Sequence, residues 1–182
     1  LTLFFVYEFA FIVYPATWAY FTQERFGWAP SMVGVSLASF GISMVIVQGF
    51  LIRWVIPKFG EVNTIIYGFI FNGLAFVFLS SVSLGWLVLA FTPVTAFGAV
   101  VTPALQGLMS RAAGADQQGE LQGVIASAKS LAMILAPLVL TWLFYHFTDD
   151  VGIYLPGAAF ALSAALMVLC FFVFLGWRRG QS

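Results

Sequence analysis

Long apolar runs alternate with short polar gaps along the whole chain. Most runs are long enough to cross the hydrocarbon core of a bilayer, which takes roughly 20 apolar residues in a helix. The pattern predicts six transmembrane helices, over residues 1–21, 31–56, 62–81, 84–109, 120–147 and 151–177. No run alternates like a strand, and the strands of a membrane barrel would span only about 10 residues. The sequence therefore predicts an all-α membrane protein.

The gaps between the runs contain residues that turn or end a helix. Gly27 and Pro30 separate the first two runs, Pro57 and Gly60 the next two. Glycine and proline at such positions interrupt helical hydrogen bonding. We therefore expect each gap to be a short connection between antiparallel helices.

Composition agrees with a membrane protein and excludes several other classes. Hydrophobic residues make up 62% of the 182 residues and charged residues only 8%, against about 25% charged in soluble domains. The net charge is zero, so there is no electrostatic basis for binding nucleic acid. Cys170 has no second cysteine with which to form a disulfide. No metal-ligand spacing, phosphate loop or nucleophile–base arrangement is present, and we expect neither a cofactor nor an enzyme.

Basic residues in the gaps predict how the chain is oriented. Five of them fall in the second gap, the fourth gap and the tail, against one in the first gap. The five are Arg53, Lys58, Arg111, Arg178 and Arg179, and the one is Arg25. Lysine and arginine are enriched on the cytoplasmic side of membrane proteins, so we expect the C-terminus in the cytoplasm. Leu1 already lies inside an apolar run, and we expect further residues upstream of it.

Two ionisable residues, Glu8 and Lys129, lie inside apolar runs. A charged side chain at that depth costs about 2.5–3.5 kcal/mol on insertion scales and is expected to face a cavity or a partner. We predict that both face one interior, either as an ion pair or as parts of a path for protons or substrate. The alternatives are a purely structural pair, or a lysine that extends toward the cytoplasmic surface.

Uncharged polar residues inside the runs form a second set of candidates for lining a cavity. They are Gln48, Asn72, Gln106 and Gln122, together with Thr95, Thr102, Ser127 and Ser130. Gln122 lies two helical turns before Lys129, which would place both on one face. The alternative is that these residues hydrogen-bond neighbouring helices together.

Several motifs in order along the chain carry a resemblance to a known family. They are Tyr14-Pro15-Ala16-Thr17-Trp18 with Arg25-Phe26-Gly27-Trp28, Gly34-x-Ser36-Leu37-x-x-Phe40-Gly41, and Pro103-Ala104-Leu105-Gln106-Gly107-x-Met109-Ser110-Arg111 with Gln118-Gly119-Glu120-Leu121-Gln122-Gly123 and Ala136-Pro137-Leu138. With these motifs the chain resembles the C-terminal half of major facilitator transporters, in the tetracycline-resistance-like branch of drug:proton antiporters. Lys58, Gly60 and Glu61, together with Arg111, resemble the family's cytoplasmic loop motif.

The resemblance implies a fold and a function. The chain would supply the second six-helix half, made of 3+3 inverted repeats, of a twelve-helix fold, with an N-terminal half as its partner in the bilayer. The first, second, fourth and fifth predicted helices would line the cavity, so Glu8 and Lys129 would both lie on cavity-lining helices. The implied function is proton-coupled efflux of a small lipophilic molecule across a bacterial inner membrane.

Two other functions remain open at this point. The chain could be a half-size transporter that assembles from two copies, or a membrane receptor or accessory protein that kept the fold without transporting. The sequence also departs from tetracycline exporters, because Asn72 and Met44 stand where those exporters carry an aspartate and a histidine. We therefore expect a different substrate and different coupling residues.

Overall fold

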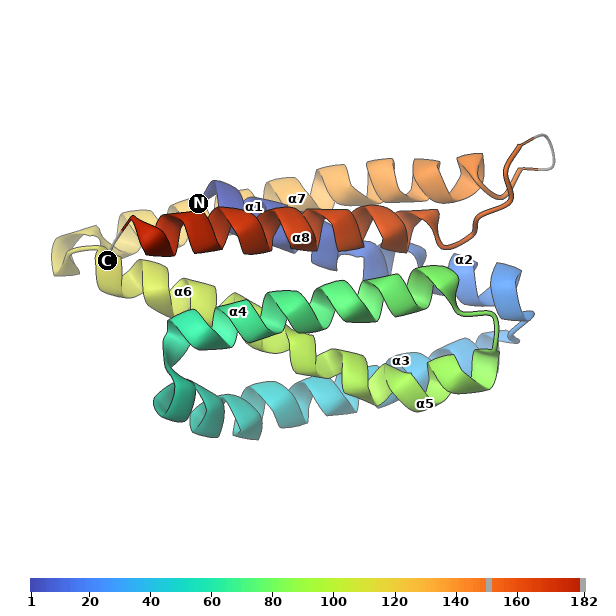
Figure 1. Ribbon diagram of the computed structural model, residues 1–182, viewed down its shortest axis with the longest axis horizontal. Helices are drawn as coiled ribbons and strands as arrows, with labels where there is room; N and C mark the ends of the chain where they lie inside the picture. Colours follow the sequence, from blue (N-terminus) through green and yellow to red (C-terminus); the bar gives the residue numbers. More distant parts are fainter. Residues whose placement is uncertain (150–151, 181–182) are drawn as a thin grey trace.

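The computed structural model describes residues 1–149 and 152–180, which form a bundle of long helices (Figure 1). The described residues contain no strand, which confirms the predicted all-α fold. The α-helices are α1 (Thr2–Phe11), α2 (Val13–Phe26), α3 (Pro30–Ile46), α4 (Ile52–Ser81), α5 (Gly85–Thr95), α6 (Val101–Ala112), α7 (Gln118–His146) and α8 (Ala158–Arg179). Three short irregular helices join them: the π-helical η1 (Val47–Leu51) and the 3₁₀ segments η2 (Ala96–Val100) and η3 (Ala115–Gln117).

Five helical stretches of the described chain are long and apolar enough to cross a membrane. They are Thr2–Phe26, Pro30–Ser81, Gly85–Ala112, Gln118–His146 and Ala158–Arg179. This supports a membrane protein with several spanning helices. The count of six rests on the longest stretch, which has 52 residues.

Gly60 divides that longest stretch into two rods. A straight helix of its length would extend about 78 Å, more than twice the roughly 30 Å hydrocarbon core. Gly60 has φ 77° and ψ 161°, a non-helical conformation inside α4. The chain reverses direction there (Figure 1), and α4 contacts the preceding η1 segment. The break falls in the polar gap where the sequence predicts a turn, and the six-span count stays a prediction that depends on it.

Prolines explain where the other long stretches become irregular. Pro15 has no N–H to donate to the carbonyl of Phe11, and α1 ends at Phe11. Pro103 likewise cannot donate to Ala99, which lies in η2. A 3₁₀ segment tightens the backbone where regular bonding is lost. Membrane helices tolerate such breaks when neighbouring groups satisfy the freed carbonyls.

The last predicted helix begins later than the sequence suggests. Its predicted start at Val151 lies outside the described residues, and α8 begins at Ala158. Residues 152–157 are not in a regular helix. Pro156 disfavours a helical conformation in the residue before it, which explains why the helix cannot start upstream of the proline.

Helix packing places α4 and α8 against each other over most of their length (Figure 1). Phe69 of α4 meets Phe174 of α8 edge to face, with ring centroids 6.0 Å apart. α1 packs against both α7 and α8. Tyr14 of α2 lies in the aromatic core. Its ring centroid is 6.0 Å from that of Phe160 and 5.3 Å from that of Phe76.

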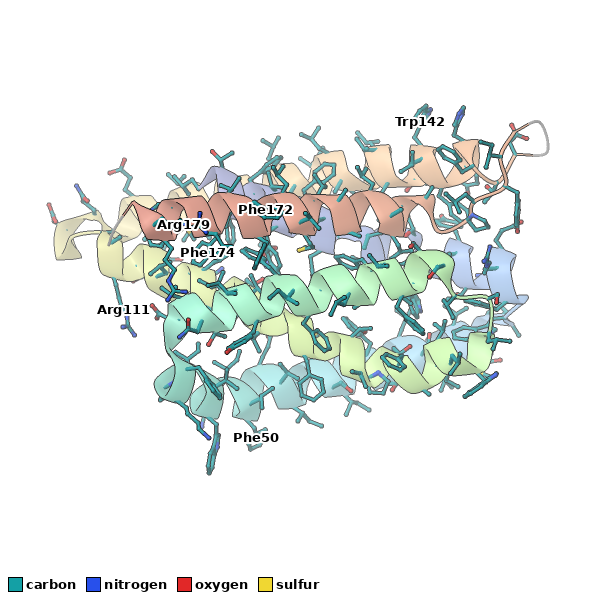
Figure 2. The ribbon with its side chains drawn as sticks, viewed as in Figure 1. Phe50, Arg111, Trp142, Phe172, Phe174 and Arg179 are labelled. Carbon is teal, nitrogen blue, oxygen red and sulfur yellow. The ribbon has the colours of Figure 1, made fainter. Side chains whose placement is uncertain are left out.

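The two ends of the bundle differ in their polar contacts. Arg111 and Arg179 lie at the end where α1 starts and α8 ends, and Trp142 lies near the opposite end (Figure 2). At that opposite end the Arg25 Nε donates a hydrogen bond to the Val82 carbonyl, at 3.2 Å. Arg111 and Arg179, two of the five basic residues expected on the cytoplasmic side, thus lie at one end of the bundle, here called the basic end.

Candidate functional site

Five residues form a buried polar cluster where α1, α4 and the η2–α6 junction meet. They are Tyr7, Glu8, Asn72, Gly98 and Thr102. The Thr102 hydroxyl donates a hydrogen bond to Glu8 Oε1 at 2.8 Å. Glu8 is 5% exposed, so this residue is almost fully enclosed within the helix bundle.

The Glu8 carboxyl group has an uncharged hydrogen-bond partner. That partner is the Thr102 hydroxyl, and no ion pair within the described residues involves Glu8. A carboxylate in an apolar environment is costly when charged and uncompensated. Intramembrane carboxyl groups are rare for this reason, and they usually face a cavity or a partner.

The Gly98 carbonyl joins two further members of the cluster. Its carbonyl accepts hydrogen bonds from Asn72 Nδ2 at 3.0 Å and from the Tyr7 hydroxyl at 3.4 Å. Gly98 lies in η2, where the tightened backbone presents this carbonyl to α1 and α4. Tyr7 and Glu8 are consecutive, so one turn of α1 contacts both Gly98 within η2 and Thr102 just after it.

Asn72 fits against Gly98 with no space between them. A Cβ added to Gly98 would overlap Asn72 Oδ1, so only glycine leaves room for this side chain. Asn72 is fully buried, and its Oδ1 has no hydrogen-bond partner in the structure. The residue predicted to line a cavity therefore holds α4 against η2.

Lys129 differs from Glu8 in its surroundings. Lys129 is exposed on α7, and no ion pair joins it to Glu8 within residues 1–149. Gln122 is exposed on the same helix. Neither side chain belongs to the buried polar cluster.

The other two predicted glutamines also lie outside the cluster. Gln48 is exposed in η1, with Nε2 4.0 Å from Met44 Sδ. Gln106 is half-buried on α6, one helical turn after Thr102. The structure thus brings Glu8 and Asn72 into one cluster, places Gln106 next to it, and leaves Gln48, Gln122 and Lys129 apart.

The four residues of the predicted loop motif lie at the basic end of the bundle. Arg111 Nη2 and Glu61 Oε1 are 3.1 Å apart, with the Glu61 side chain 10% exposed and that of Arg111 74% exposed. Gly107 leaves room for the Glu61 carboxylate, which would lie 2.5 Å from an added Cβ. Gly60 forms the turn, and Lys58 Nζ lies 5.6 Å from the centre of the Phe59 ring.

Sequence reasoning did not identify the direct partners of Glu8 and Asn72. Gly98 looks unremarkable as one of 17 glycines in the chain. Its place between Pro93 and Pro103 in one apolar run is the available signal, because two prolines indicate a backbone carbonyl that needs a partner.

Sequence comparison places this helical bundle in a family. Residues 1–181 match the profile of the Major Facilitator Superfamily. The chain belongs to the Major Facilitator Superfamily. Within the family it is 38% identical to the class B tetracycline resistance protein of Escherichia coli over 160 residues, covering 86% of this chain and 40% of that protein. The class C protein of Escherichia coli is 34% identical over 170 residues, covering 93% of this chain and 42% of that protein.

A more distant relative of this chain is an animal protein. The mouse Hippocampus abundant transcript-like protein 1 is 26% identical over 170 residues, which cover 85% of the chain and 34% of that protein. The chain spans about two-fifths of the length of the tetracycline resistance proteins that it matches. Membership in the Major Facilitator Superfamily confirms the predicted resemblance.

Proposed function

We propose that this chain is the C-terminal half of a proton-coupled exporter of a small lipophilic molecule. The family and the printed names of its relatives support drug efflux. The fraction of those relatives that the chain covers supports a second half-bundle as its partner. The exporter would lie in a bacterial inner membrane, with the basic end of the bundle in the cytoplasm.

The burial of Glu8 beside a neutral partner is the observation that supports the proton-coupled part of this proposal. Its carboxyl group is buried in a helix that would cross the membrane, and its hydrogen-bond partner is neutral. Protonation of Glu8 would remove its charge and change the strength of the Thr102 hydrogen bond, because hydrogen bonds to charged acceptors are the stronger ones. Thr102 follows η2 directly, so the proton would act where the α5–α6 stretch is irregular.

The exposure of Lys129 on α7 supports a partner half. Lys129 lies near the middle of α7, where an ammonium group facing lipid would be costly. A second half-bundle would cover this face and enclose a polar space between the halves. In this proposal Lys129 faces that space and contacts substrate or a carboxylate of the other half.

Proton release in proteoliposomes tests the proposal with the full-length protein. Each drug of a panel that includes tetracycline and other neutral and cationic drugs is added to the proteoliposomes. A drug that is a substrate is expected to release protons from wild-type protein. Glu8→Gln should reduce the release at least tenfold, because an amide cannot take up the proton. Glu120→Gln makes the same chemical change at an exposed position and should leave the release unchanged.

Lys129→Met is expected to reduce transport as well, by removing the only charge on the central part of α7. Wild-type transport and proton release by both Glu8→Gln and Lys129→Met would show that neither residue couples protons to export. Absence of any response across the panel would favour a receptor or accessory role for the fold.

A further inference from the structure

An apolar groove follows α4 on the surface of the bundle. One part has a volume of about 350 Å³ and is lined by Leu51, Val55, Tyr67, Phe71, Leu74 and Phe97 among others. A second part of about 310 Å³ is lined by Phe71 and Leu74 again, with Phe78 and Phe91. The two parts adjoin at Phe71 and Leu74, and together they are here called the α4 groove.

The α4 groove has the length of one leaflet of a bilayer. From Tyr67 to Phe78 it follows α4 for about 16 Å at 1.5 Å per residue. Half of a typical hydrocarbon core is about 15 Å. Tyr67 and Leu74 are 60% and 66% exposed, so the groove is open along its side rather than enclosed. An extended hydrocarbon chain could lie in it from end to end.

Lys58 stands at one end of the α4 groove. Leu51 and Val55 line the groove, and Lys58 follows Val55 by three residues, which places it on the same helical face. Its Nζ lies 5.6 Å from the centre of the Phe59 ring. That ring in turn meets the ring of Tyr67 edge to face, at 6.2 Å. A line of three side chains therefore connects the ammonium group to the groove wall.

The charge is at the end of the bundle where the other basic residues gather. Lys58 precedes Glu61 by three residues, and Glu61 forms an ion pair with Arg111. An occupant that matches the groove must therefore be apolar along about one leaflet and anionic at the end next to Lys58. Basic residues at the cytoplasmic surface attract the headgroups of anionic lipids.

We propose that the α4 groove binds an anionic phospholipid, with an acyl chain along α4 and the phosphate at Lys58. A free phosphate ion would have no use for the apolar walls, and a neutral lipid would gain nothing from the lysine. The groove lining includes Phe97 and Val100 of η2 but none of the five residues of the buried polar cluster. The proposed lipid site therefore stands independently of the identity of the exported molecule.

Native mass spectrometry of the full-length protein in mild detergent tests this site. The probes are phosphatidylglycerol and phosphatidylcholine with identical acyl chains. Wild-type protein should retain more phosphatidylglycerol than phosphatidylcholine. Lys58→Gln should lower the retention of phosphatidylglycerol about fivefold, the effect of one basic residue near an anionic headgroup. Arg53→Gln removes the same charge from the same end of the bundle but off the groove face, and should leave retention unchanged.

A second variant tests the apolar part of the groove. Leu74→Trp should fill its middle and lower the retention of both lipids, while the unfolding temperature stays near that of wild type. Equal retention of phosphatidylglycerol by wild-type protein, Lys58→Gln and Leu74→Trp would overturn the proposal. Displacement of the lipid by inorganic phosphate, or a crosslink showing a helix of the other half in the groove, would overturn it too. None of these measurements depends on transport, so the two proposals can fail separately.

Discussion

Gly98 and Asn72 show, at the scale of single residues, how closely α4 and η2 approach. The Asn72 side chain occupies the space where any other residue at position 98 would carry its Cβ. Gly98→Ala should therefore push Asn72 out of place and weaken its hydrogen bond to the Gly98 carbonyl. We expect a loss of about 1–3 kcal/mol in the free energy of unfolding, the usual cost of overpacking. Thermal unfolding of the full-length protein measures it.

Two further variants separate this clash from a general effect of alanine. Gly123 faces open space, so Gly123→Ala should leave stability unchanged or raise it slightly through helix propensity. In Gly98→Ala combined with Asn72→Ala, the smaller side chain makes room for the new methyl group, so the two losses should not add. Strict additivity would show that Asn72 and Gly98 do not interact.

The buried polar cluster could be predicted only in part at this scale. Glu8 and Asn72 stand out in the sequence because ionisable and amide groups are rare in apolar runs. Their partners do not, because Thr102 follows Glu8 by 94 residues and the contact depends on how α6 crosses α1. A sequence pattern reports which face of a helix is polar and not which helix that face will meet.

At the scale of elements, the turn at Gly60 decides the path of the chain between α3 and the rest of α4. Its φ of 77° with ψ of 161° belongs to a region that essentially only glycine enters. Gly60→Asn should cost about 1–3 kcal/mol through backbone strain. We expect a lower unfolding temperature and less folded protein in the membrane fraction.

Gly27 provides the matched comparison for this turn. It ends α2 in the left-handed conformation, with φ 63° and ψ 30°. Asparagine tolerates that conformation better than other non-glycine residues, so Gly27→Asn should be much milder than Gly60→Asn. Equal losses for both variants would mean that backbone conformation is not what requires glycine at position 60.

Helices were easier to predict than the irregular segments within them. The apolar runs match the helices because length and composition are properties of each run alone. The segments η1 and η2 were not predicted, since the change from α to π or 3₁₀ hydrogen bonding leaves the apolar pattern intact. Pro93 and Pro103 flank η2 and are the available signal for it, whereas no proline lies within Val47–Leu51 to indicate η1.

At the scale of the whole molecule, the predicted orientation can be tested by cysteine labelling. Ser83 and Asp116 are exposed in gaps at opposite ends of the bundle. In right-side-out vesicles, a membrane-impermeant maleimide should label Ser83→Cys and spare Asp116→Cys until the membrane is permeabilised. Basic residues near the Asp116 end should hold it in the cytoplasm.

The background for this experiment is the full-length protein with any cysteines outside this chain replaced by serine, because Cys170, the single cysteine of the chain, is buried. Labelling of Asp116→Cys alone in intact vesicles would show that the orientation is opposite to the predicted one. Labelling of both would mean that the two gaps share one side of the membrane, which the bundle in Figure 1 does not allow.

The long contact between α4 and α8 has a consequence for how the protein is made. During synthesis α4 leaves the ribosome well before α8, so Phe69 and its neighbours enter the membrane without their later partners. Asn72 meets Gly98 sooner, because only α5 separates η2 from α4 in the chain. Lipid or an insertion chaperone must cover the α8-facing side of α4 in the interval. Truncation before α8 should therefore leave nascent chains with α4, Asn72 and η2 assembled and that side open to degradation.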